Sequence, residues 1–194
     1  VPFHTVFFFL LLLGTLLAGT LQIGLLRSVL FEFSISKNWV VELQTWLDTL
    51  IPPNPSLGIE GVSVHGLMLI FFLVLIALTA IKGFKNIFEG LNAWTYVALG
   101  LITLTLIIAS LAVQTTPTGL RVGISGRFVV EVLILVGIWW MASHILSAKE
   151  RQEWLWETWR FVKQIIPLLL MGVFVASIAR SLIPPVWIQT LAGR

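Results

Sequence analysis

The chain has no cysteine among its 194 residues, which excludes disulfides, thiolate metal sites and cysteine nucleophiles. Charged residues are also scarce, at 11% of the chain, whereas a water-soluble domain carries about 25%. The sequence contains no phosphate-binding glycine loop, zinc-protease motif or serine-hydrolase motif. It therefore predicts neither an enzyme nor a bound cofactor or metal.

Hydrophobic residues make up 58% of the chain, which predicts a multi-pass membrane protein whose solvent is mostly lipid. The net charge of +3 does not indicate nucleic-acid binding, because the basic residues are scattered between apolar runs. Such residues anchor the loops of membrane proteins. The lipid bilayer, here the plasma membrane, is therefore the expected surrounding, and no nucleic acid is expected as a partner.

Five apolar segments are long enough to form membrane helices. They are Val6–Leu26, Val64–Ile81, Trp94–Val113, Phe128–Leu146 and Pro167–Ile183. Because lipid offers no hydrogen bonds, each segment must satisfy its own backbone, and helices do so at these lengths. No strand pattern is evident, so the sequence predicts an all-α membrane protein with about five transmembrane helices. The first segment could also be the apolar part of a signal peptide, but its length and its lack of a basic flank favour a retained helix.

The connections between the segments predict further elements. Residues 27–61 form a long loop in which Trp39–Leu50 has the apolar spacing of a short interfacial helix. Residues 114–119 predict a turn, and residues 147–163 predict a second amphipathic helix in the headgroup plane. Positive charge is dense in the second and fourth loops, which favours a cytoplasmic N-terminus and cytoplasmic second and fourth loops.

Glu131 is the main ionisable residue within an apolar run, and such residues are functional candidates. It follows Arg127 by four residues on the same predicted helix. The two side chains could form an ion pair near the interface, or Glu131 could couple transport to a proton or a substrate. The histidines His4, His65 and His144 lie near the ends of different segments. They are predicted to be interfacial rather than ligands of one metal.

The fifth segment is followed by Pro184-Pro185, and sixteen residues lie between Pro167 and Pro184. Sixteen helical residues span roughly 24 Å, less than a bilayer core of about 30 Å, and short interrupted helices are typical of transporters. The proline pair could form a surface turn, or it could break a helix that lines a substrate path. Arg180, near the end of this segment, could snorkel to the interface or face an anion.

Residues 154–193 carry a longer pattern: Trp159-Arg160-Phe161-Val162-Lys163, then Ile166-Pro167, Gly172, Ile183-Pro184 and Leu191-Ala192-Gly193. This pattern resembles the predicted-permease family that includes organoarsenical efflux permeases. Members of that family show a charged, aromatic lead-in, then an apolar helix that begins with Ile-Pro, and then a second Ile-Pro stretch that ends in glycine. The first four segments resemble no family.

The apolar segments place four N-terminal membrane helices in residues 1–147, and the resemblance implies that residues 148–194 begin a permease core. It also implies an N-terminal portion of a permease, completed by a second chain or a C-terminal portion. The intramembrane charges and the helix break make Arg180, Pro184, Pro185, Gly193 and Glu131 the candidates for the substrate path. The sequence thus predicts a transport protein for a small solute or an ion. The alternative is a membrane scaffold that docks a partner and transports nothing.

Overall fold

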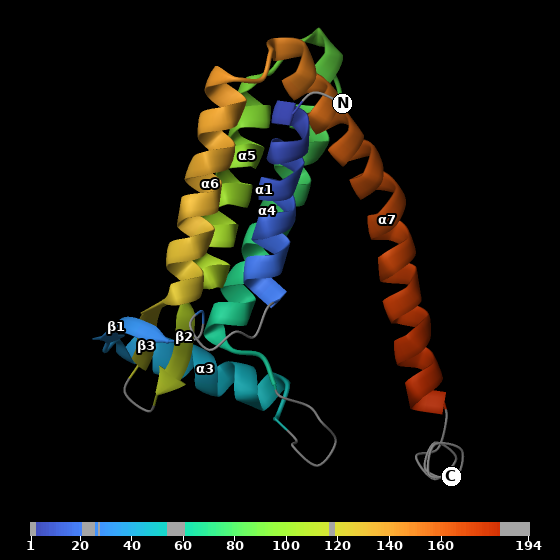
Figure 1. The fold of residues 1–194 in the computed structure, drawn as a ribbon. Helices are drawn as coiled ribbons and strands as arrows, with labels where there is room; N and C mark the ends of the chain where they lie inside the picture. Colours follow the sequence, from blue (N-terminus) through green and yellow to red (C-terminus); the bar gives the residue numbers. More distant parts are fainter. Residues whose placement is uncertain (1–2, 21–25, 27, 54–60, 117–118, 183–194) are drawn as a thin grey trace, which may run out of the picture. The chain divides into compact units, whose positions relative to one another are not determined.

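The computed structural model describes residues 3–20, 26, 28–53, 61–116 and 119–182, with side chains up to residue 176. The chain divides into two compact units, Val1–Arg151 and Gln152–Arg194. In chain order the described elements are α1 Phe3–Thr20, β1 Val29–Ile35, α3 Asn38–Leu50, α4 Val64–Phe84, the 3-10 turn η2 Ile87–Glu89, α5 Ala93–Ser110, β2 Ala112–Thr116, β3 Gly119–Ser125, α6 Gly126–His144 and α7 Ala148–Leu182 (Figure 1).

Four helices of the first unit, α1, α4, α5 and α6, form a bundle (Figure 1). In this bundle α4 packs on α5, α5 on α6, and α6 on α1. These helices and α7 are each long and apolar enough to cross a membrane. Large apolar side chains cover their outer surface: Phe71 is 58% exposed and Leu133 is 65% exposed. Such a surface is stable in lipid rather than in water, so the prediction of a multi-pass membrane protein is confirmed.

The end of α4 and the start of α5 meet backbone to backbone at Gly83. A methyl group on Gly83 would lie 2.7 Å from the backbone nitrogen of Thr95. The buried hydroxyl of Thr95 donates a hydrogen bond of 2.7 Å to the Gly83 carbonyl. The Asn92 side chain donates to the same carbonyl at 3.3 Å and accepts from the Thr95 nitrogen at 2.9 Å, which caps α5. These contacts fix the position of the start of α5 against the end of α4.

We expect Thr95→Val to lower the free energy of unfolding by about 0.6 to 1.7 kcal/mol, the range measured for hydrogen bonds between membrane helices. Valine keeps the shape of threonine but cannot donate to the Gly83 carbonyl. Titration with sodium dodecyl sulfate, followed by tryptophan fluorescence, measures the change. Thr105→Val is the control, because the Thr105 hydroxyl donates within its own helix, to the Leu101 carbonyl of α5. Equal losses in both variants would contradict a specific contribution of the Thr95–Gly83 contact.

One end of the bundle carries a three-stranded antiparallel sheet in the order β1-β3-β2 (Figure 1). We call this the sheet end. The prediction of an all-α protein is therefore wrong in this part of the chain. The third apolar segment, predicted as Trp94–Val113, contains nearly all of α5 and then, after Leu111, the first two residues of β2.

Of the residues predicted as a turn, 114–116 belong to β2 and Gly119 begins β3, which pairs with β2, and residues 117–118 lie outside the described residues. Gly119 has a φ of +148°, and a side chain there would collide with the carbonyl oxygen of Ile35 in β1. Only glycine tolerates both conditions. Glycine at this position therefore lets β3 lie close against β1.

The predicted interfacial helix is present as α3, which packs between the sheet and the start of α4. Val40 and Leu47 of α3 form a buried cluster with Val64 of α4, and Leu120 of β3 packs against it. The Gln44 side chain donates to the Val62 carbonyl at 3.1 Å and accepts from the Val64 nitrogen at 3.0 Å. The sheet, α3 and the start of α4 thus form one packed layer at the sheet end.

The helix α7 is continuous over 35 residues and contains Pro167 in its interior. The amphipathic lead-in and the apolar segment predicted to start at Pro167 are therefore one helix, which corrects the two-segment prediction. At ~1.5 Å per residue α7 is about 52 Å long, more than the roughly 30 Å of a bilayer core. A proline inside a membrane helix removes one backbone hydrogen bond but need not end the helix.

Candidate functional site

Glu131 lies on the inward face of α6, at 3% exposure. The helix begins after Ser125, whose hydroxyl accepts a hydrogen bond of 3.4 Å from the Phe128 nitrogen. Three residues beyond Glu131, Ile134 packs against α1, where a methyl group on Gly14 would lie 3.3 Å from the Ile134 side chain. Leu133, on another side of the helix, is 65% exposed. The helical rotation therefore places Glu131 inside the bundle rather than toward lipid.

The Oε1 atom of Glu131 is buried and has no hydrogen-bond partner among the described residues. The described side chains also show no ion pair between Glu131 and Arg127, so the ion-pair interpretation of their four-residue spacing is not supported. A buried polar atom without a partner costs free energy. A carboxyl group in this position can accept a proton or hold a cation.

Arg127 lies one helical turn before Glu131 and lines a cavity of about 170 Å³ at the sheet end. Polar groups of two neighbouring elements share this cavity: Ser110 ends α5, and Ser125 precedes α6. The Ser125 hydroxyl donates to the Ser110 carbonyl at 3.4 Å. One turn of helix is about 5.4 Å, so the cavity lies about one turn from the depth of Glu131 along α6.

The three histidines do not come together. His4 of α1 lies 3.2 Å from a carboxylate oxygen of Glu150, which lies in the first turn of α7. His144 stacks on Trp140 at the end of α6. The Nδ1 atom of His65, near the start of α4, is buried and has no partner among the described residues. Sequence reasoning treated His65 as interfacial and missed this buried atom, although its place beside the start of an apolar run was a signal.

The described residues contain no group of three acidic or histidine side chains that could hold a metal ion. Of the other predicted site residues, Arg180 lies in α7 without a described side chain. Pro184, Pro185 and Gly193 lie outside the described residues. The predicted site is thus represented in the structure by Glu131 and its surroundings.

No family model, curated protein or solved structure matches the chain in the three comparisons. Inferences about its function therefore rest on its own residues.

Proposed function

We propose that the protein transports a small solute or an ion across the plasma membrane, and that Glu131 binds the proton or cation that couples to this movement. The observation that carries the proposal is the buried, unpartnered carboxyl oxygen of Glu131 inside a membrane bundle. Ionisable groups in such places mark ion paths and proton relays. A carboxyl with a purely structural role would be expected to have a partner that offsets its burial.

The cavity at the sheet end is the candidate entry; it is lined by Arg127, Ser110 and Ser125 together with Leu26, Leu111 and Ala112. A solute or water that enters there is about one helical turn from the level of Glu131. The guanidinium group of Arg127 carries a positive charge at this entry. The entry therefore favours anions or neutral solutes, whereas Glu131 favours a proton or cation. This separation of charges suits coupled movement of two species.

The family resemblance of residues 154–193 adds the remaining parts of the proposal. From it we infer an N-terminal part of a permease, completed by a second chain or a C-terminal portion. Arg180, Pro184, Pro185 and Gly193 would then contribute to the substrate path. The proposal includes no enzymatic step and no cofactor.

The test uses the full protein in liposomes that contain the pH-sensitive dye pyranine. Small solutes of different charge are added outside, and dye fluorescence reports proton movement. We expect solute-dependent proton movement with the wild type. With Glu131→Gln we expect no more proton movement than in liposomes without protein. Glu42→Gln is the matched control, because it removes the same charge from an exposed position on α3. It should behave as the wild type.

Two results would overturn parts of the proposal. Wild-type rates in Glu131→Gln would remove Glu131 from the coupling step. The second result has two parts: the wild type moves none of the solutes in the panel, and Arg180→Ala and Pro184→Ala have no effect in cells. This result would favour the alternative, a scaffold that docks a partner.

A further inference from the structure

Strand β1 has one polar face and one apolar face, and the register of the sheet shows which face is which. Phe31 pairs with Ile124, Phe33 with Val122, and Ile35 with Leu120. Directly paired residues of an antiparallel sheet point to the same side. Leu120 packs against the buried cluster of α3 and α4, so the aromatic face of β1 is the face turned toward the helices.

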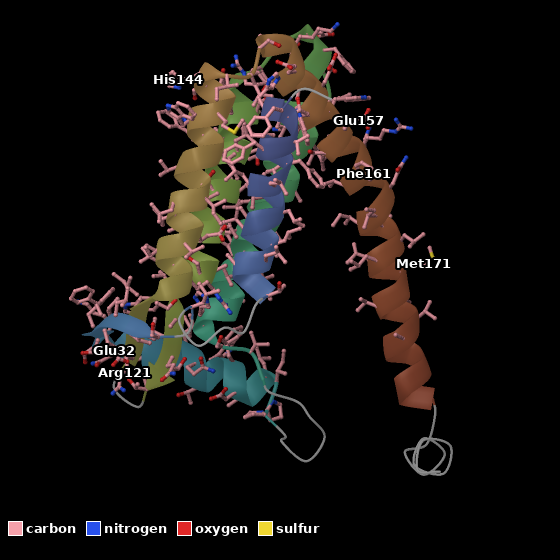
Figure 2. All side chains as sticks on the ribbon, viewed as in Figure 1. Glu32, Arg121, His144, Glu157, Phe161 and Met171 are labelled. Atoms are coloured by element: carbon pink, nitrogen blue, oxygen red, sulfur yellow. The ribbon has the colours of Figure 1, made fainter. Side chains whose placement is uncertain are left out.

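The opposite face of β1 is polar. Glu32 and Ser34 alternate with the aromatic residues, and Glu32 pairs with Arg121 of β3 at 3.3 Å. Figure 2 shows Glu32 and Arg121 on the side of the sheet away from the helical bundle. The sheet is therefore amphipathic across its thickness, with its polar side directed away from the membrane helices.

The aromatic face of β1 remains largely uncovered. Phe31 is 73% exposed and Phe33 is 49% exposed, since α3 packs mainly against α4, β2 and β3. At the same end of the unit, α3 exposes a second apolar stripe: Trp39, Trp46 and Leu50 follow each other at intervals of seven and four residues and are more than half exposed. Two separate elements thus present aromatic side chains at the end of the bundle.

We propose that β1 lies on the bilayer, with Phe31, Phe33 and Ile35 inserted at the level where the headgroups meet the acyl chains. The Gly126 nitrogen, at the first residue of α6, donates a hydrogen bond of 3.0 Å to the Ser28 carbonyl next to β1. This bond holds the strand beside the start of a membrane helix. The exposed apolar surface of α6, which includes Val129 and Leu133, begins there. The apolar face of β1 continues this lipid-facing surface.

The backbone of β1 fixes the depth of this contact. Among the described strands β1 is an edge strand, so its outer backbone groups need partners from water or headgroups. An open sheet edge does not occur in the hydrocarbon core. Amphipathic elements at the interface bury Trp, Phe and Leu side chains at the boundary of headgroups and acyl chains, where apolar rings and hydrated backbone are both satisfied. The sheet and α3 together form an in-plane anchor, and this role does not depend on whether the protein transports a solute.

The absence of cysteine from the chain allows a direct test with single-cysteine variants. Phe31→Cys and Phe33→Cys carry a nitroxide spin label on the apolar face, and Glu32→Cys and Ser34→Cys are matched controls on the polar face of the same strand. The full protein is placed in phosphatidylcholine liposomes. Collision rates with oxygen, which concentrates in lipid, and with a water-soluble nickel chelate are measured by electron paramagnetic resonance.

We expect the ratio of oxygen to nickel collisions to alternate along β1, several-fold higher at 31 and 33 than at 32 and 34. High nickel accessibility at all four positions would place β1 in water and overturn the proposal. Low accessibility to both reagents at 31 and 33 would mean that a protein surface, such as a second copy, covers the strand. This result would also overturn it.

A second measurement needs no substitution. Wild-type protein in liposomes that contain a phospholipid with a photoreactive acyl chain is illuminated and digested, and the modified peptides are identified by mass spectrometry. We expect lipid adducts on the peptide that contains residues 29–35. Adducts on the α6 peptide without any on the β1 peptide would contradict the proposal.

Discussion

Replacing Glu131 by leucine is expected to raise the free energy of unfolding by about 1 to 3 kcal/mol, the cost of a buried polar group without a partner. Leucine has a similar size and leaves no unsatisfied oxygen inside the bundle. The same substitution should abolish coupled transport, because leucine binds neither a proton nor a cation. A gain in stability with a loss of activity is expected of a residue kept for function.

The measurement is the midpoint of unfolding in sodium dodecyl sulfate, with tryptophan fluorescence as the probe. Glu42→Leu is the control, since Glu42 is exposed on α3 and surface substitutions usually change stability by less than about 0.5 kcal/mol. A loss of stability in Glu131→Leu would mean that the carboxyl has a structural partner, which would contradict its role as an unpartnered coupling group.

Gly83→Ala is expected to destabilise the protein by about 1 to 3 kcal/mol, the usual range for overpacking. The added methyl group would lie 2.7 Å from the Thr95 nitrogen and 2.8 Å from the Trp94 carbonyl carbon. Both are backbone atoms, so no side-chain rotation can relieve the contact. The start of α5 would have to move away from α4, which would also lengthen the hydrogen bond from Thr95 to the Gly83 carbonyl.

Gly100→Ala provides the matched control, because it makes the same change in α5 at a position with no atom within 4 Å of the added methyl group. Its stability should be unchanged or slightly higher, since alanine favours a helix over glycine. Unfolding curves of the two variants are compared with that of the wild type. A Gly83→Ala variant as stable as Gly100→Ala would show that the two helices can separate without cost.

The bounds of α4, α5 and α6 could be predicted from the sequence to within three residues, whereas α7 begins at Ala148, nineteen residues before the predicted start at Pro167. The second segment, predicted as Val64–Ile81, is α4 from Val64 to Phe84. Lipid requires long apolar runs and internal backbone hydrogen bonds, so composition alone identifies such helices. The prediction failed where an apolar run did not end with its helix: α5 stops at Ser110, and the following apolar residues belong to β2.

The strands were missed because their pattern is short. In β1 the alternation of Phe31, Glu32, Phe33, Ser34 and Ile35 covers five residues, inside a long loop where a helix was the more visible signal. Its pairing partner lies about ninety residues away along the chain. Strand pairing over such distances is decided by packing, here of the partner strand β3 against α3, and not by local preference.

The sequence by itself determined that this chain is a membrane protein and that Glu131 is an ionisable group within an apolar helix. Both follow from residue types, because lipid excludes charge. Only the tertiary structure decided that Arg127 lines a cavity instead of pairing with Glu131, and that the aromatic face of β1 turns toward the helices. A four-residue spacing or an alternating strand leaves such choices open, and the packing of neighbouring elements settles them.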